Sequence, residues 1–142
     1  MKDNNLIKRE FDIPSHSRHL AEVRQEVENV AKECGGFDES DIYQIKVAVS
    51  EAVANAIEHG SPLGELNKVH INIDCDAEAM LIEVSDQGVF KARLPVTEGR
   101  PSHRGRGIFL MTALVDEVKI MEHQSGTVVS LMKLKKSIKK IS

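Results

Sequence analysis

The most informative stretch of this 142-residue sequence reads Glu51-Ala-Val-Ala-Asn55-Ala-Ile-Glu-His59-Gly60. It ends a segment in which apolar residues recur at three- and four-residue spacings, the period of an amphipathic helix. Glu51 and Asn55 share the polar face of that helix because they are four residues apart. Any surface helix has such a face, but asparagine has a poor helix propensity and usually needs a partner inside a helix. We therefore expect a long helix that ends near His59 and carries a candidate site.

The residues before this helix predict a strand and a shorter helix. The strand covers Leu6 to Ile13, Pro14 ends it, and Ser15 is placed to cap the helix that follows. The apolar stripe of this first helix runs until the Gly35-Gly36 pair, which breaks it. Asp38 then provides a cap for the long helix.

After the long helix the period of the pattern changes to two. Residues from Val69 to Cys75 alternate between apolar and polar, which is typical of a half-buried strand, and Asp76 to Ala79 predict a turn. A second alternating strand begins at Met80. Its parity carries Asp86 to the inward face at the end of the strand.

Residues 87–104 combine glycine and proline breaks with no periodicity, and they predict a long loop. Within it, residues 89–104 are a candidate lid. A third, apolar helix is expected from Ile108 to Val115, opened by Gly105-Arg106-Gly107.

Two closing strands are predicted at Glu117 to His123 and Thr127 to Leu134, and the lysine-rich residues 133–140 are expected to be a solvated end. The order β-α-α-β-β-loop-α-β-β contains no repeat or linker, so residues 1–142 are expected to form a single domain. The simplest packing is an α+β fold. It is a two-layer α/β sandwich with a mixed or antiparallel sheet and three helices on one face.

Composition limits the function classes. The formal net charge is −3, so no positive field draws the chain to nucleic acid or to an anionic membrane. Apolar residues make up 41% and charged residues 29%, which is typical of a globular domain rather than a disordered chain. Cys34 and Cys75 have no spacing that indicates a zinc site or a disulfide framework. With no segment that resembles a signal peptide or a membrane span, we expect a cytoplasmic protein.

Two further segments carry candidate chemistry. Asp86 needs a partner or a cavity, because its strand neighbours point into the core. At a cavity its carboxylate would accept a hydrogen bond from an exocyclic amine, and Gly88 would let a ligand ring approach the backbone. The alternative is a turn-forming aspartate. Arg104 to Gly107 open the third helix, where free N–H groups, the helix dipole and the arginines suit a phosphate; a flexible hinge is the alternative there.

Together, four segments resemble the boxes of the Bergerat ATP-binding fold, which gyrase, MutL, histidine kinases and certain serine kinases share. They are Glu51 to Gly60, Asp86-Gln87-Gly88, Gly105 to Met111 and Gly126-Thr127. The small size, the N-terminal strand and helix, and Phe90 where the wider superfamily has glycine resemble anti-sigma factor serine/threonine kinases of the stress-response type. The resemblance spans nearly the whole chain.

The resemblance implies a role for each site residue. Glu51 would be the general base that takes the proton of the attacking serine hydroxyl, and Asn55 would coordinate the Mg²⁺ that bridges the phosphates of ATP. Asp86 would accept a hydrogen bond from the adenine amine beside Gly88, and Thr127 would help to hold the ring. The residues that would bind the phosphates are Arg104, Gly105, Arg106 and Gly107. Phosphoryl transfer of this kind depends mostly on positioning and electrostatics.

The implied function is that of an ATP-dependent protein serine kinase that acts as an anti-sigma factor. It would phosphorylate a serine of a STAS-type anti-sigma antagonist, sequester a sigma factor when the partners switch, and form a homodimer. A non-catalytic protein-binding module gated by ATP or ADP would carry the same motifs, but such relatives can lose the glutamate of the first box, so Glu51 favours catalysis. His59 and His103 receive no role, because a lone histidine at a helix end or in a loop is more often solvated.

Overall fold

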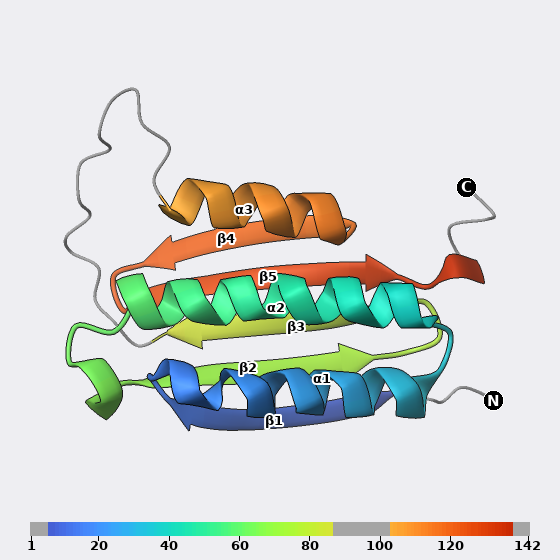
Figure 1. The fold of residues 1–142 in the computed structure, drawn as a ribbon, viewed down its shortest axis with the longest axis horizontal. Helices are drawn as coiled ribbons and strands as arrows, with labels where there is room; N and C mark the ends of the chain where they lie inside the picture. The colour runs from blue at the N-terminus through green and yellow to red at the C-terminus, as the bar shows by residue number, and fades with distance from the viewer. Residues whose placement is uncertain (1–5, 87–102, 138–142) are drawn as a thin grey trace.

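The computed structural model describes residues 6–86 and 103–137, with the backbone alone for 103–106. In this part of the chain five antiparallel strands form one sheet in the order β1-β2-β3-β5-β4, and three α-helices cover one of its faces (Figure 1). The strands are β1 (Ile7–Pro14), β2 (Lys68–Cys75), β3 (Ala79–Asp86), β4 (Glu117–His123) and β5 (Gly126–Leu134). The helices are α1 (Leu20–Cys34), α2 (Glu39–His59) and α3 (His103–Leu114). The predicted α+β sandwich is confirmed, with a sheet that is antiparallel throughout.

The core lies between the helices and the sheet. The apolar stripes that the sequence predicts are buried: Val23, Val27, Val30 and Ala31 on α1, and Ile42, Ile45, Val49, Ala52, Val53 and Ala56 on α2. The strands supply every second residue to the same layer, as their period of two requires. Burial of one such aliphatic side chain contributes about 1.5–3 kcal/mol, so this layer is the main source of stability.

The start of α2 is fixed by a reciprocal cap. The Asp38 carboxylate accepts a hydrogen bond from the Asp41 N–H at 2.8 Å, and the Asp41 carboxylate accepts one from the Asp38 N–H at 3.1 Å. The predicted cap is therefore confirmed. Glu28 of α1 then contacts Lys46 of α2, which joins the two helices. The hydrogen bonds from Lys32 and Lys46 lower the pKa of the Glu28 carboxyl to about 2.

The prediction that Ser15 caps the first helix is wrong. A 3₁₀ turn, Ser17–His19, precedes α1, and its cap is His16, whose Nδ1 accepts a hydrogen bond from the Arg18 N–H at 3.0 Å. The Ser15 hydroxyl instead donates to Ser61 Oγ at 2.6 Å. Ser15 lies where the end of β1 meets the end of α2, so a tertiary contact takes the hydroxyl that a local cap would have used.

The third helix begins earlier than predicted. α3 starts at His103 and ends at Leu114, so Gly105 and Gly107 lie inside its first turns rather than ahead of them. A glycine lowers helix stability by only about 1 kcal/mol, which tertiary packing offsets. The predicted loop and candidate lid lie outside the described residues as far as 102, and their last two positions belong to α3.

The expectation of a solvated lysine end is wrong for Lys133 and Lys135, whereas Lys136 is exposed as expected. Lys133 and Lys135 are only 5% and 6% exposed. Lys133 shares the inward parity of Leu131 on β5, and Lys135 directly follows the strand. The Lys133 ammonium donates to Gln44 Oε1 and to the carbonyl oxygen of Leu114, both at 2.8 Å. A long lysine stem can be buried when acceptors satisfy its charged end.

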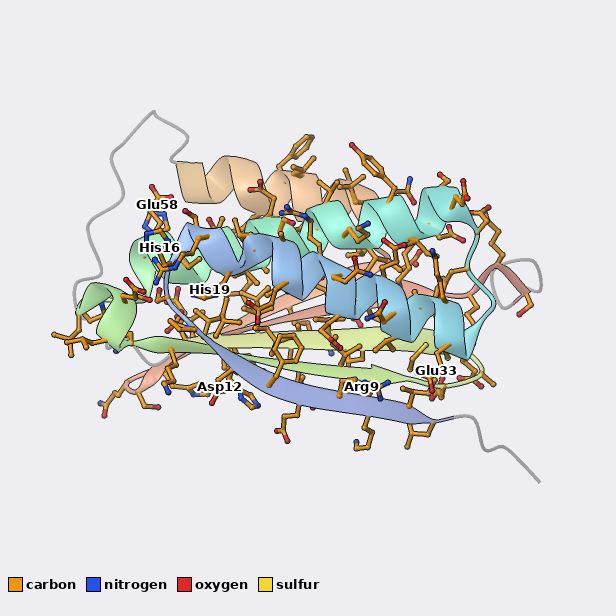
Figure 2. All side chains as sticks on the ribbon, turned by 60° about the horizontal axis from the view of Figure 1, so that its bottom comes forward. Arg9, Asp12, His16, His19, Glu33 and Glu58 are labelled. Atoms are coloured by element: carbon orange, nitrogen blue, oxygen red, sulfur yellow. The ribbon has the colours of Figure 1, made fainter. Side chains whose placement is uncertain are left out.

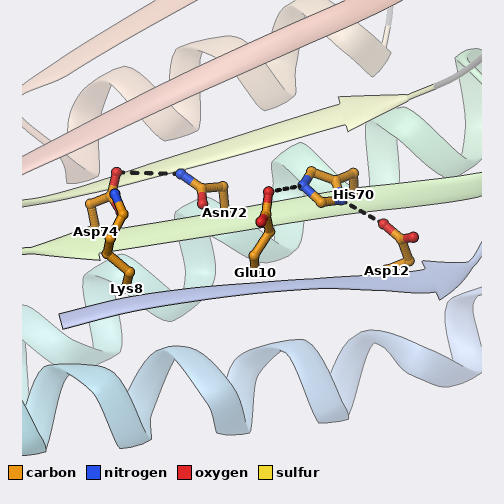
Figure 3. Close-up of polar contacts among 6 residues, drawn as sticks. All are labelled: Lys8, Glu10, Asp12, His70, Asn72 and Asp74. Atoms are coloured by element: carbon orange, nitrogen blue, oxygen red, sulfur yellow. Dashed lines mark hydrogen bonds and ion pairs between the residues drawn. The ribbon is translucent and has the colours of Figure 1, made fainter.

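Charged side chains join β1 to its neighbours on both faces of the sheet. On the helix side, Arg9 donates to Glu33 of α1 at 2.9 Å (Figure 2). On the outer face, His70 of β2 lies between two carboxylates of β1 (Figure 3): its Nδ1 is 2.5 Å from Asp12 Oδ1, and its Nε2 is 2.9 Å from Glu10 Oε2. The hydrogen bond with Asp12, followed by that with Glu10, raises the pKa of His70 above its ordinary value.

The wild-type chain should be more stable than His70→Gln at low pH and should lose this advantage as the pH rises. Because the pKa is raised in the folded state, the stabilisation is complete below the unfolded-state value of about 6.5 and is lost as the pH passes through the folded-state value. His70 is 39% exposed, so solvent screening keeps the effect below about 1 kcal/mol. Thermal unfolding of both proteins from about pH 6 to pH 9 measures it. A difference that grows with pH would contradict the expectation, and Asp12→Asn should abolish most of the dependence.

Candidate functional site

A shallow hollow lies where the last turns of α2 meet the sheet and α3. The end of α2, the end of β3 and the start of β5 meet at this edge of the molecule (Figure 1). The apolar part of the lining is Ala52, Ala56, Val84, Ile108, Met111, Ile120 and Val129. The polar part is Asn55, His59, Asp86 and Thr127. A mostly apolar lining with a few convergent polar groups is typical of a site for a small ligand.

Asp86 and Thr127 form the polar corner of this hollow. Asp86 ends β3 and reaches the hollow, as its predicted parity requires, and its Oδ1 accepts a hydrogen bond from the Thr127 N–H at 3.1 Å. Thr127 is 4% exposed, and its Oγ1 has no hydrogen-bond partner among the described residues. A buried hydroxyl without a partner costs free energy. A ligand with polar edge groups would satisfy it.

Two glycines make room for Asp86. A Cβ on Gly60 would lie 2.1 Å from Asp86 Oδ2, and a Cβ on Gly126 would lie 2.2 Å from the Asp86 carbonyl oxygen. Gly126 also has a φ of 145°, which a residue with a side chain rarely adopts. The sequence motifs include both glycines, but their contact with Asp86 is visible only in the tertiary structure.

Gly60→Ala should destabilise the fold by about 1–3 kcal/mol, the usual cost of overpacking. Because it displaces the Asp86 carboxylate, it should also weaken binding of the nucleotide that the sequence resemblance implies. Gly60 has a negative φ, so backbone strain does not contribute. Gly64→Ala is the matched control, because a Cβ there meets open space but the φ of Gly64 is 60°. That variant should show only a strain cost and normal nucleotide binding. Chemical denaturation and a nucleotide titration measure the two effects, and equal behaviour of the variants would contradict the steric account.

Glu51 and Asn55 face α3, not open solvent. A Cβ on Gly107 would lie 2.9 Å from Glu51 Oε1 and 3.2 Å from Asn55 Nδ2, so the absence of a side chain lets the α3 backbone approach both. Asn55 also lines the hollow. The polar pair that the sequence predicts is therefore placed at the edge of the hollow, next to one of the predicted phosphate-binding glycines.

The remaining predicted residues lie at or beyond the limit of the described structure. Gly88 is outside it. Arg104, Gly105 and Arg106 are in the first turn of α3, where their backbone is described and their side chains are not. The first four N–H groups of a helix have no partner within it, so with a start at His103 the free groups belong to residues 103–106.

His59 is a lining residue to which the sequence analysis assigns no role. Its Nε2 is buried without a hydrogen-bond partner in the described part of the chain, and it lies 3.6 Å from Glu58 Oε1, beyond hydrogen-bond length. The sequence feature that could have identified His59 as a site residue is its spacing from Asn55. His59 follows Asn55 by four residues, as Asn55 follows Glu51, so all three share one face of α2.

Two negative findings apply to residues 6–86 and 103–137. No cluster of three or more histidine, cysteine, aspartate or glutamate side chains there could hold a metal ion. Among the helices that the structure describes, none combines the length and apolar composition that a membrane span requires.

Comparison with known proteins identifies the family. The family model described as a histidine kinase-like ATPase domain matches residues 13–133, a range that contains the three α-helices, β2, β3 and β4 in full, β5 except for its last residue, and the end of β1. The chain belongs to this family. An ATPase family implies that the chain binds ATP, and the lining of the hollow has the chemistry that an adenine base would need. Its apolar walls suit a flat base, while the Asp86 carboxylate and the unpaired Thr127 hydroxyl offer hydrogen bonds to the edge of the base.

Curated relatives within the family are serine-protein kinases. The chain is 28% identical to serine-protein kinase RsbW of Bacillus subtilis over 141 residues, which covers 92% of this chain and 87% of the relative. It is 30% identical to serine-protein kinase RsbW of Oceanobacillus iheyensis, covering 87% and 84% of the two chains. The family recognised from the sequence and its enzyme class, a protein serine kinase, are confirmed by these relatives.

Solved structures share the fold. The RsbU and RsbW domains of a Mycobacterium tuberculosis protein match 90% of this chain with a TM-score of 0.65 and 23% identity, although the chain spans only 32% of that longer protein. A blue-light activated histidine kinase domain from Erythrobacter litoralis matches 91% of the chain with a TM-score of 0.56 and 17% identity. These matches confirm the predicted architecture.

Proposed function

We propose that this family member is an anti-sigma factor kinase that works in the cytoplasm. It uses ATP to phosphorylate a serine of a STAS-type anti-sigma antagonist, and it sequesters a sigma factor until its partners switch. The kinship with serine-protein kinases RsbW supports the reaction type. One structural observation supports the proposal above the others: Asn55, Asp86 and Thr127 line one hollow, and Glu51 lies beside it where α2 faces Gly107 of α3.

The adenine end of the site is the polar corner. The Asp86 carboxylate already accepts one hydrogen bond, from the Thr127 N–H, and it has further acceptor capacity for the exocyclic amine of adenine. The Thr127 hydroxyl can donate to or accept from the ring edge, directly or through water. The apolar side chains of the lining would exclude water from the ring. This corner therefore selects the base.

The phosphate end lies toward α3. Asn55 would supply one oxygen ligand to Mg²⁺, which binds proteins through few side chains and keeps phosphate and water as its other ligands. The free N–H groups at the start of α3 and the side chains of Arg104 and Arg106 would hold the phosphates. Bound Mg·ATP supplies the transferable γ-phosphoryl group and neutralises the charge that develops on it.

Glu51 is the general base of the proposed reaction. Its carboxylate accepts the proton of the serine hydroxyl as the hydroxyl oxygen attacks phosphorus, and ADP leaves with the electrons of the broken bond. The Glu51 Oε1 lies beside Gly107, at the junction of α2 and α3, where an acceptor protein could bring its serine. The rest of the rate acceleration comes from holding the serine oxygen, the γ-phosphorus and the leaving oxygen of ADP in line.

The partners follow from this proposal. The chain would bind the antagonist and the sigma factor alternately, with the ATP or ADP state deciding between them, and it would act as a homodimer. An ATP-gated module without transfer is the rival, and the same experiment separates the two.

The experiment is a labelling reaction in a lysate of the source cells. The purified chain is incubated with Mg²⁺ and γ-labelled ATP, with Glu51→Ala in parallel. An acid-stable label on a small protein that is absent with the variant supports the proposal, and sequencing of the band tests whether it is a STAS-type antagonist. An acid-labile label would indicate histidine chemistry. Measurable ATP binding without any labelled protein would favour the non-catalytic module.

A further inference from the structure

Two cysteines that are distant in sequence lie near each other at the end of the α/β sandwich opposite the hollow (Figure 1). Cys34 is the last residue of α1, and Cys75 is the last residue of β2. Both sulfurs approach the carbonyl oxygen of Asp76, at 3.5 Å for Cys34 and 4.0 Å for Cys75. Both cysteines are free thiols, and their approach to the same carbonyl oxygen places the two side chains next to each other.

The two thiols have different surroundings. Cys75 is fully buried, whereas Cys34 is partly exposed. Burial, together with the hydrogen bond to Cys34, raises the pKa of the Cys75 thiol, so Cys75 stays protonated. Only Cys34 is accessible to a small reagent from solvent. The difference in exposure means that Cys34 would react with the reagent first and Cys75 would react afterwards, with the modified Cys34.

A buried cation contacts the accessible sulfur. The ammonium of Lys135, a residue that is 6% exposed, lies 3.3 Å from Cys34 Sγ and 5.7 Å from the centre of the Phe37 ring. Its stem is fixed by close packing, since a Cβ on Gly36 would lie 2.5 Å from Lys135 Cδ. A charged donor held at this distance stabilises negative charge on the sulfur.

We propose that Cys34 and Cys75 form a peroxide-sensitive pair, with Cys34 as the attacking sulfur, Cys75 as the resolving thiol and Lys135 as a positioning residue. The proposal concerns the end of the sandwich far from the nucleotide and does not depend on the kinase reaction. A lone cysteine would carry no such role, but here a second thiol and a buried ammonium converge on the first.

The chemistry requires one hydroperoxide. The Cys34 sulfur attacks one oxygen of hydrogen peroxide, the O–O bond breaks, and the product is a sulfenic acid and one water. The Cys75 sulfur then attacks the Cys34 sulfur, and the departing hydroxyl leaves as a second water with the Cys75 proton. Two thiols are oxidised to one disulfide while one peroxide is reduced to two waters. The new bond joins the end of α1 to the end of β2, and the loop that it closes contains the whole of α2.

The test treats the reduced full-length chain with one equivalent of hydrogen peroxide at neutral pH. Mass spectrometry should find a monomer lighter by two hydrogens, with a Cys34–Cys75 peptide that disappears on reduction. Cys75→Ser should stop at a sulfenic acid on Cys34 that dimedone traps, and Cys34→Ser should leave Cys75 unmodified. A disulfide between two chains, modification of Cys75 in Cys34→Ser, or no reaction under these conditions would overturn the proposal.

The role of Lys135 has its own comparison. Lys135→Met should slow the reaction of Cys34 about tenfold, the value of one charge-assisted hydrogen bond. Lys133→Met is the matched control, because Lys133 is equally buried two residues away and its ammonium donates to oxygen acceptors instead of sulfur. That variant should react at the wild-type rate. In concentrated urea all three proteins should react alike, and a difference that persists there would exclude the folded contact as the cause.

Discussion

Replacing Glu51 by alanine is expected to slow serine phosphorylation by about 10²–10⁴-fold, the usual contribution of a general base, while ATP still binds. The carboxylate is the proton acceptor of the proposed reaction, and it lies at the α2–α3 junction, outside the lining of the hollow. Its loss should therefore affect the chemical step and not the affinity for the nucleotide. Single-turnover transfer of labelled phosphate, with ATP affinity measured separately, distinguishes the two.

Two further variants sharpen this prediction. Glu51→Gln keeps the shape that packs against Gly107 but cannot accept a proton, so it should be as inactive as the alanine variant. Glu58→Ala removes an exposed carboxylate further along the same helix and should leave the rate unchanged. If Glu51→Gln transferred phosphate at the wild-type rate, Glu51 would be a packing residue and the base would have to lie elsewhere.

Asp86→Asn is expected to weaken ATP binding by about 10–100-fold, which corresponds to the loss of a hydrogen bond to a charged group. The asparagine oxygen can still accept the hydrogen bond from the Thr127 N–H. Its amide nitrogen would then face the exocyclic amine of adenine, so that two donors would oppose each other. A fluorescence or calorimetric titration with ATP measures the loss.

The preference for adenine over guanine tests the role of Asp86 more specifically than the affinity for ATP alone. Because the carboxylate is the proposed reader of the amine, Asp86→Asn should lose much of its preference for ATP over GTP. Asp74→Asn is the control, since Asp74 lies on the outer face of the sheet and pairs with Lys8 at 3.0 Å (Figure 3). If Asp86→Asn bound ATP like the wild type, the assignment of Asp86 as the adenine reader would be wrong.

Local sequence patterns predicted most of the fold because each pattern reports a local physical requirement. The stripe of α1 and the alternation of β2 reflect the periods at which side chains return to one face. Asp38 was recognisable as a cap because its carboxylate binds an N–H three residues away. The same reasoning failed at Ser15, where a hydroxyl suitable for a cap donates to Ser61, 46 positions along the chain.

The residues of the candidate site also fall into those that local sequence patterns predicted and those that only the tertiary structure revealed. The sequence by itself determined that Glu51 and Asn55 share a helix face and that Asp86 points inward, because the helical and strand periods set both directions. Only the tertiary structure decided that Gly60 and Gly126 close on Asp86, that His59 joins the lining, that Lys133 is buried, and that Cys34 meets Cys75. These are contacts between elements that the chain brings together after long intervals. No local period encodes them, because they depend on how the helices and strands pack against each other.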